Sequence, residues 1–186
     1  MNKTLITLSL ILIAAMSANA QEFNQVKVGL GFGYASPADG GGGICLYLEP
    51  GYRINDQISV QLRLESAAMA KVVDGNQGTV TANGSYTVNG QYYFGTNKVR
   101  AYAGLGLGLY GVANASVSSS GGGQLDGGSV LGFYPRVGVD VGHFNFLFDY
   151  NIVGSSPYTA NNGEEFDVKN SYFTLKAGFT IGGGKK

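Results

Sequence analysis

Large apolar side chains alternate with small or polar ones along much of the chain. From Gln25 to Ala35, apolar or aromatic residues fill every second position between Val26 and Tyr34, while Lys27 and three glycines fill the positions between them. A period of two predicts a β-strand. A face made of glycine and one lysine suits the narrow lumen of a small barrel whose large residues point outward into lipid.

The same alternation recurs along the chain and predicts eight strands. They cover residues 25–35, 44–54, 58–65, 86–94, 99–110, 133–141, 144–152 and 172–181. Short turns at 55–57, 95–98 and 142–143 alternate with four long segments, Ser36 to Gly43, Ser66 to Thr79, Ser116 to Ser129 and Gly154 to Asn170. The pattern therefore predicts an all-β fold, an eight-stranded antiparallel transmembrane β-barrel with short periplasmic turns and long extracellular loops.

Two further features of the pattern refine this barrel. Val72, Val73, Val80 and Thr81 flank the polar tip at residues 74–78, so we expect the third and fourth strands to continue beyond the membrane as a hairpin ribbon. Aromatic residues also gather near the outward strand ends, which predicts two interfacial girdles. These are Tyr34, Tyr86, Phe133 and Phe173 on the loop side, and Tyr52, Phe94, Phe144 and Phe179 on the turn side.

The first twenty residues differ from the rest. Lys3, an apolar run from Leu5 to Met16 and the small residues Ala18 to Ala20 predict a cleaved secretory signal peptide at 1–20, followed by the barrel domain at 21–186. The run is shorter than the roughly 20 residues of a membrane-spanning helix. Any insertion into a membrane is therefore expected to use strands.

Composition agrees with an exported β protein. The chain has 31 glycines with 12 tyrosines and 10 phenylalanines, whereas disordered chains are poor in aromatic residues. Its 12 basic and 12 acidic side chains balance, which argues against a nucleic-acid partner. The single Cys45 cannot form an internal disulfide, so a closed barrel in a bilayer is the expected source of stability.

With its signal peptide, its eight amphipathic strands and its strands rich in glycine and aromatic residues, such as 28–34 and 173–181, the chain resembles the small eight-stranded outer-membrane barrels of the OmpA/OmpX type. The resemblance covers residues 21–186 and implies a location in the bacterial outer membrane and assembly by the barrel-assembly machinery. Many such proteins end on an aromatic residue that this machinery reads. Here Phe179 is instead followed by Thr180, Ile181 and a glycine-lysine tail.

Strand parity points ten charged side chains into the lumen, where they must pair. They are Lys27, Glu49, Arg53, Arg63, Glu65, Arg100, Arg136, Asp140, Asp149 and Lys176. The short turns fix the register, because pairing Ile54 with Ile58 sets Glu49 beside Arg63.

By the same reasoning, pairing Val141 with Phe144 sets Arg136 beside Asp149. An ion path or gate is one interpretation of the inward charges. We favour an interior plug that replaces a hydrophobic core, because eight strands leave room only for side chains.

No catalytic, cofactor or metal site is predicted. The one histidine, His143, lies at a turn, whereas a lipid hydrolase of the outer leaflet needs its base at the loop end. Cys45 is expected to be an inert small residue. The glycine runs lack the ending of a phosphate loop, and the acidic cluster at Glu164, Glu165 and Asp167 matches no calcium-loop spacing.

The sequence leaves several functions open. The first is a non-enzymatic, monomeric outer-membrane platform that contacts lipid and displays its four long loops to extracellular partners, with ribbon edges near Val72 and Val80 that could accept a strand. The second is a narrow pore for ions or small solutes, including apolar ones. The third, which we disfavour, is a lipid-modifying enzyme. A soluble barrel of the lipocalin kind would instead turn its apolar residues inward.

Overall fold

The computed structural model describes residues 22–37, 41–73, 77–116, 126–159, 165–168 and 170–185. Within that part of the chain, no helix is long and apolar enough to cross a membrane. The predicted signal peptide, residues 1–20, lies outside the described residues.

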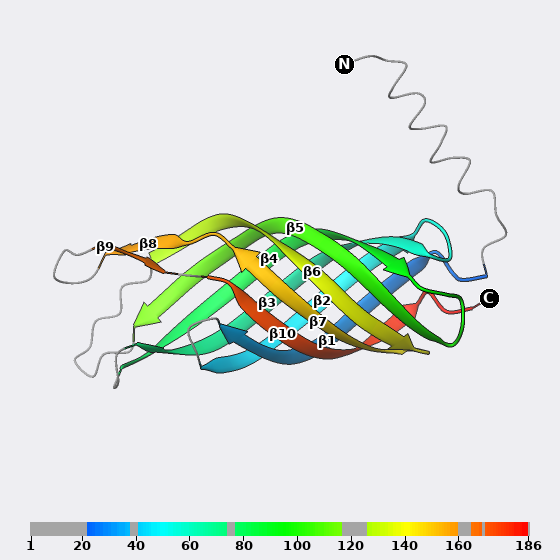
Figure 1. The fold of residues 1–186 in the computed structure, drawn as a ribbon, viewed down its shortest axis with the longest axis horizontal. Helices are drawn as coiled ribbons and strands as arrows, with labels where there is room; N and C mark the ends of the chain where they lie inside the picture. Colours follow the sequence, from blue (N-terminus) through cyan, green and yellow to red (C-terminus); the bar gives the residue numbers. More distant parts are fainter. Residues whose placement is uncertain are drawn as a thin grey trace, which may run out of the picture.

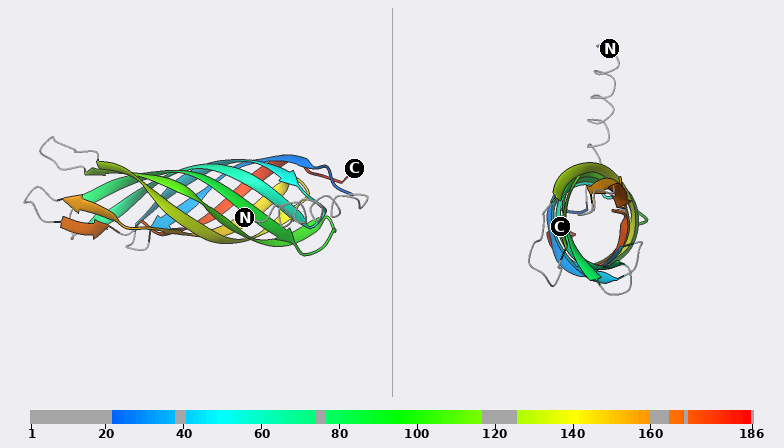
Figure 2. Two further views of the ribbon diagram at one scale, coloured as in Figure 1. Left: turned by 90° about the horizontal axis from the view of Figure 1, so that it is seen from above. Right: turned by 90° about the vertical axis from the view of Figure 1, so that its left-hand side faces the viewer.

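Eight strands close into an antiparallel barrel, as predicted (Figure 1, Figure 2). They are β1 (Val26–Pro37), β2 (Gly42–Arg53), β3 (Ile58–Val73), β4 (Gln77–Tyr93), β5 (Val99–Ser116), β6 (Asp126–Val141), β7 (Phe144–Val153) and β10 (Tyr172–Gly182). Around the wall the order is β1, β10, β7, β6, β5, β4, β3, β2, so each strand pairs with its neighbours in sequence. The first and last strands, β1 and β10, close the ring, with Lys27 opposite Gly182 and Pro37 opposite Tyr172.

The strands on one side of the barrel extend further than the sequence predicts. The ladder between β3 and β4 runs to Val73 opposite Gln77, so most of the predicted loop Ser66 to Thr79 is the expected hairpin ribbon. β5 and β6 also enter the predicted loop Ser116 to Ser129, where Asn114 faces Asp126. The backbone hydrogen bonds continue there although apolar and polar residues no longer alternate. Outside an apolar solvent both faces of a strand can be polar, so pairing does not require that alternation.

A separate small hairpin lies within the segment that was predicted as one polar loop, Gly154 to Asn170. It pairs β8 (Ser156–Thr159) with β9 (Glu165–Val168), and Figure 1 shows it at the end of the barrel opposite the C-terminus. The polar composition of this segment hides the two short strands. The predicted polar loop therefore contains a hairpin that the sequence pattern did not indicate.

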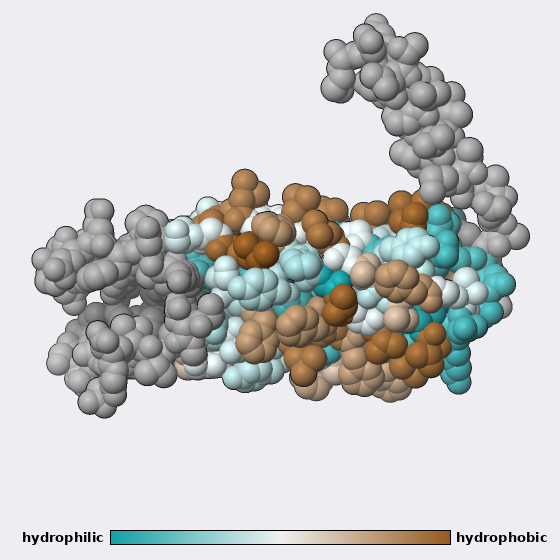
Figure 3. Space-filling view, viewed as in Figure 1, coloured by the Kyte–Doolittle hydropathy of each residue, from teal (hydrophilic) through white to brown (hydrophobic). Residues whose placement is uncertain are grey.

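The predicted inside and outside faces are confirmed. Phe32 on β1, Leu105 on β5 and Phe146 on β7 point away from the barrel and are 66%, 59% and 51% exposed. Residues one position away are buried, as Asn145 and Leu147 are on either side of Phe146. Hydrophobic residues accordingly cover the middle of the outer wall, and the end near the C-terminus is hydrophilic (Figure 3). The core of this protein is thus a polar interior within an apolar shell.

All eight aromatic residues of the predicted girdles lie on this outer face and are exposed. At the turn end, the rings of Phe144 and Phe179 are 5.5 Å apart and meet edge to face. Near the other end, Phe148 stacks on Phe173 at 6.1 Å. Aromatic rings at both ends of an apolar wall are typical of proteins that cross two membrane interfaces.

Candidate functional site

Six charged side chains form one ion-pair network in the middle of the barrel. They are Glu49 on β2, Arg63 and Glu65 on β3, Arg136 on β6, Asp149 on β7 and Lys176 on β10. Each residue is at most 5% exposed. Three cations face three carboxylates, so the network is neutral, as a group of charges this deeply buried must be.

Two contacts of the network join neighbouring strands in the register that the turns predict. Leu48 faces Leu64 on β3, and Arg63 Nε lies 2.8 Å from Glu49 Oε2. Arg136 faces Asp149 directly in the ladder, with Arg136 Nε 3.4 Å from Asp149 Oδ1. The short turns therefore determine which charges become neighbours.

Other contacts cross the lumen. Arg63 Nη1 on β3 lies 2.6 Å from Asp149 Oδ2 on β7, and Arg136 Nη1 on β6 lies 2.8 Å from Glu49 Oε1 on β2. In each pair the two strands are separated by four steps around the eight-stranded wall, so they stand on opposite sides. Lys176 adds a third bridge, since its Nζ contacts Glu65 and lies 2.7 Å from Asp149 Oδ2. The network braces opposite walls of the barrel.

Four residues of the predicted set lie apart, toward the turn end: Lys27, Arg53, Arg100 and Asp140. Arg100 on β5 faces Asp140 on β6, with Arg100 Nη2 3.5 Å from Asp140 Oδ2. Lys27 is buried nearby and donates to Gln91 Oε1 at 3.1 Å and to the Tyr93 hydroxyl at 2.8 Å. The lumen charges, which were predicted as one network, therefore form two clusters. The tilted strands place the turn-side cluster and the central network at different heights in the barrel.

Phe23, which the sequence did not single out, covers the turn-side cluster. It is 4% exposed, and the guanidinium carbons of Arg100 and Arg53 lie 4.1 and 4.9 Å from its ring centroid. Its backbone N–H donates to Asp56 Oδ1 at 3.2 Å, and Phe23 forms an isolated antiparallel β-bridge with Lys185. Phe23 precedes the alternating pattern, so no periodicity could reveal its place in the barrel mouth.

Tyrosine rings fill the spaces left by inward glycines. A Cβ atom on Gly106 would lie 2.2 Å from Tyr134 Cζ, and one on Gly178 would lie 2.1 Å from the Tyr47 hydroxyl oxygen. Glycine is required at both positions, because the ring of a residue on another strand occupies the place of its side chain. At these two positions tyrosine rings therefore fill the glycine rows.

The interior cavity at this level is small. It has a volume of about 10 Å³ and is lined by Lys27, Gly29, Tyr47, Glu49, Gln91, Tyr93, Tyr102, Arg136, Asp140, Asn145 and Thr180. This is near the smallest volume that holds one water molecule.

The residues considered for catalysis are not assembled into a site. His143 is exposed, its Nδ1 lies 2.9 Å from the Thr180 carbonyl oxygen, and its ring stacks on Phe179. Cys45 is buried with Ala35, Ala67 and Met69. The side chains of the acidic cluster at Glu164, Glu165 and Asp167 lie outside the described residues. Among the side chains that are described, no group of three His, Cys, Asp or Glu could hold a metal ion.

Comparisons with known proteins agree with this architecture. A family model of the outer membrane protein beta-barrel domain matches residues 5–180. The structure of Neisserial surface protein A is similar at 19% identity, with a TM-score of 0.55 over 84% of this chain and 95% of that one. OprG from Pseudomonas aeruginosa is similar at 15% identity, with a TM-score of 0.55 over 88% and 98% of the chains. The comparison with curated proteins gave no significant match.

Proposed function

This chain belongs to the outer membrane protein beta-barrel domain family, and from that premise we propose that it is a non-enzymatic platform. It is a transmembrane barrel of the outer membrane of Gram-negative bacteria. In the proposed role, the braced barrel holds its long connecting segments at the cell surface, where they contact extracellular partners. The short turns then face the periplasm, and the barrel acts as a monomer that the barrel-assembly machinery inserts.

The filled interior carries this proposal. Charges bridge opposite walls, tyrosines occupy positions in the glycine rows, and the cavity lined by Tyr47 and Arg136 has a volume of about 10 Å³. A hydrated ion is larger than a single water molecule and would have to break these buried ion pairs to pass. The arrangement therefore supports a rigid scaffold over the alternative of a narrow pore.

The strands that project beyond the rest of the barrel offer a surface for a partner. Pairing between β2 and β3 ends at Gly42 opposite Ala70, so 71–73 have no ladder partner on that side within the described residues. On β6, pairing with β7 begins at Gly132, and the Leu131 carbonyl accepts from the Gly154 N–H at 3.5 Å, which leaves 126–130 paired with β5 alone. Such edges present backbone N–H and C=O groups to which an extended segment of an external protein can add.

The test is planar-bilayer conductance of the refolded protein. Boiled and unboiled samples with different gel mobilities would show that the barrel has formed. The proposal expects no stable unitary conductance from such heat-modifiable protein. Steady unitary currents that change in the Arg136→Ala variant would instead establish a pore controlled by the inner charges.

Display is tested separately with whole cells that carry the protein. Shaving with a protease should remove the projecting segments, while the membrane-embedded barrel persists on gels. Binding of any surface partner should be lost with the shaved segments. If binding survives their complete removal, the partner does not use the display surface.

A further inference from the structure

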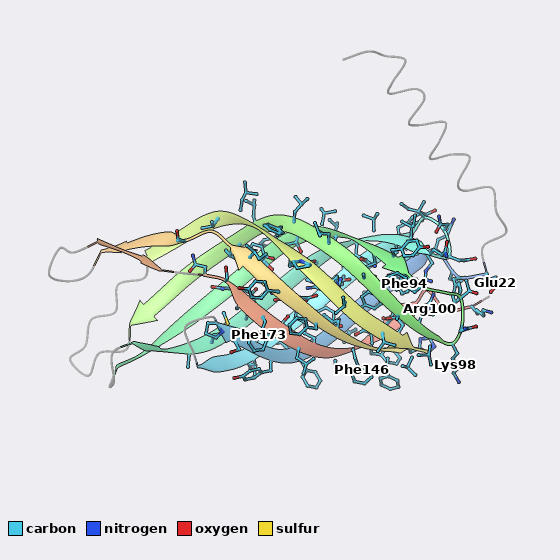
Figure 4. All side chains as sticks on the ribbon, in the orientation of Figure 1. Glu22, Phe94, Lys98, Arg100, Phe146 and Phe173 are labelled. Atoms are coloured by element: carbon cyan, nitrogen blue, oxygen red, sulfur yellow. The ribbon has the colours of Figure 1, made fainter. Side chains whose placement is uncertain are left out.

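A groove lies at the turn end of the barrel, apart from the central ion-pair network. It has a volume of about 650 Å³ and is formed by the N-terminal segment, the β4–β5 turn, the β6–β7 turn and the C-terminal segment. Its lining residues include Phe23, Asn97, Lys98, Arg100, His143 and Lys185. Figure 4 shows Lys98 and Arg100 together at this end. The volume is that of a small-molecule site.

The lining is cationic. Lys98, Arg100 and Lys185 contribute to it, whereas none of the lining residues is a carboxylate. Three acidic groups lie near, because Glu22 Oε2 is 2.8 Å from Lys185 Nζ, Asp140 contacts Arg100, and Asp56 accepts from the Phe23 N–H. The nearby Arg53, whose guanidinium lies 4.9 Å from the Phe23 ring centroid, offsets one of them. Lys98 makes no ion pair with any described residue. The groove therefore keeps a positive charge that an anion can balance.

Arg100 is built into the groove. The residue is 5% exposed, and its guanidinium lies against the ring of Phe23. Nη2 contacts Asp140 at 3.5 Å, while Nη1 is buried and has no hydrogen-bond partner among the described residues. A buried guanidinium whose Nη1 N–H groups are unused can donate them to an oxyanion.

The groove borders the aromatic girdle. His143 lines the groove, and its ring stacks on Phe179 at 5.4 Å. Phe179 in turn meets Phe144, and both are exposed on the outer wall. Such rings lie at the level of the lipid headgroups. A lipid headgroup next to this wall is therefore at the level of the groove.

We propose that the groove binds the phosphate of an anionic phospholipid headgroup, with Arg100 Nη1 and the Lys98 ammonium as the main donors. The Asn97 amide supplies a neutral donor, and Phe23 supplies an apolar wall. In the orientation proposed above, the lipid belongs to the periplasmic leaflet. Binding itself requires only that the turn end lies at a membrane interface.

The experiment measures lipid retention by native mass spectrometry. The whole barrel is refolded into phosphatidylcholine nanodiscs that contain increasing amounts of phosphatidylglycerol. The lipid molecules that stay bound after the protein is released from the nanodisc are then counted. Wild type should retain one phosphatidylglycerol in preference to phosphatidylcholine. Lys98→Gln should weaken retention roughly fivefold, the usual effect of one lysine near an anionic lipid. Lys71→Gln, at the other end of the barrel, is the matched control and should not change it.

A second variant distinguishes lipid binding in a specific site from general electrostatic attraction of anionic lipid to the barrel. Arg100→Lys keeps the charge but loses the Nη1 donors of the guanidinium, so it should also weaken retention, and heat-modifiable mobility would show that it folds. Equal retention by wild type, Lys98→Gln and Arg100→Lys overturns the proposal. Soluble glycerol phosphate carries the same phosphate group without a lipid tail, so it tests whether the groove binds a free phosphate instead of a lipid. If it binds with the same dependence on Lys98 while phosphatidylglycerol is not preferred, lipid is overturned as the ligand.

Discussion

Asp149 is the residue on which the central network converges. It is fully buried, and its carboxylate lies 2.6 Å from Arg63 Nη1, 2.7 Å from Lys176 Nζ and 3.4 Å from Arg136 Nε. Three cations around one carboxylate would repel one another if Glu49 and Glu65 did not share them. Each charge in the lumen therefore depends on several others, and the removal of one leaves its partners buried without a counterion.

Arg136→Ala should lower the stability of the barrel by about 3 to 5 kcal/mol, because it removes one cation from a neutral buried group. Lys71→Ala, in the projecting part of β3, should cost little. Thermal midpoints followed by heat-modifiable gel mobility compare the two variants. Equal midpoints for both would contradict the model of a structural ion-pair network.

Gly106→Ala and Gly90→Ala should have different effects, although both glycines lie in the interior of a strand. The Cβ on Gly106 would meet the Tyr134 ring at 2.2 Å, whereas nothing lies within 4 Å of a Cβ on Gly90. Overpacking at Gly106 should cost about 1 to 3 kcal/mol. Gly90→Ala should be neutral or slightly stabilising. Urea unfolding in lipid vesicles measures the difference, and a similar loss in both variants would argue against tyrosine packing in the lumen.

At the scale of elements, the sequence determines the strands and their local register but not what crosses the barrel. Alternation alone places Glu49 and Arg63 inside, and the tight turn makes them neighbours. The contact of Arg63 with Asp149 depends on barrel closure, which no local pattern encodes. The β8–β9 hairpin and the extension of β5 were not predicted either, because polar strands outside a membrane lack the apolar face that reveals a strand.

The N-terminal segment acts as a cover for the turn-side mouth. Asn24 N–H donates to the Gly184 carbonyl at 2.9 Å, and Glu22 and Phe23 N–H groups donate to the Asp56 carboxylate. These contacts join the two ends of the chain to the β2–β3 turn. Phe23 is thereby held over Arg53 and Arg100, whose charges its ring face attracts.

Phe23→Ala should destabilise the folded barrel by about 3 kcal/mol, as expected for loss of a buried phenylalanine. Phe23→Leu keeps most of the apolar volume and loses only the ring face, so it should cost about 1 kcal/mol. Urea unfolding of the refolded barrels provides both values. If both variants unfold like wild type, the segment does not close the mouth in solution.

For the whole molecule, the polarity of a soluble protein is reversed. Charged residues such as Arg63 and Asp149 are buried, while Leu105 and Phe146 are exposed on the outer wall. In water this apolar wall would drive aggregation, whereas in a bilayer it is the surface that lipid chains cover. Because lipid covers the apolar residues on the outside, the barrel needs no apolar core inside. A neutral interior of paired charges is therefore sufficient for stability.

Leu105→Arg and Val99→Arg test this reversal on one strand. The two residues are almost equally exposed, at 59% and 57%, but Leu105 lies in the middle of the barrel wall and Val99 follows the turn at the end. In a bilayer, arginine should cost about 2 to 4 kcal/mol at Leu105 and about 0 to 1 kcal/mol at Val99. In water the two changes would cost similar amounts. Reversible unfolding in lipid vesicles therefore reports whether the middle of β5 lies in hydrocarbon, and equal losses for the two variants would place it elsewhere.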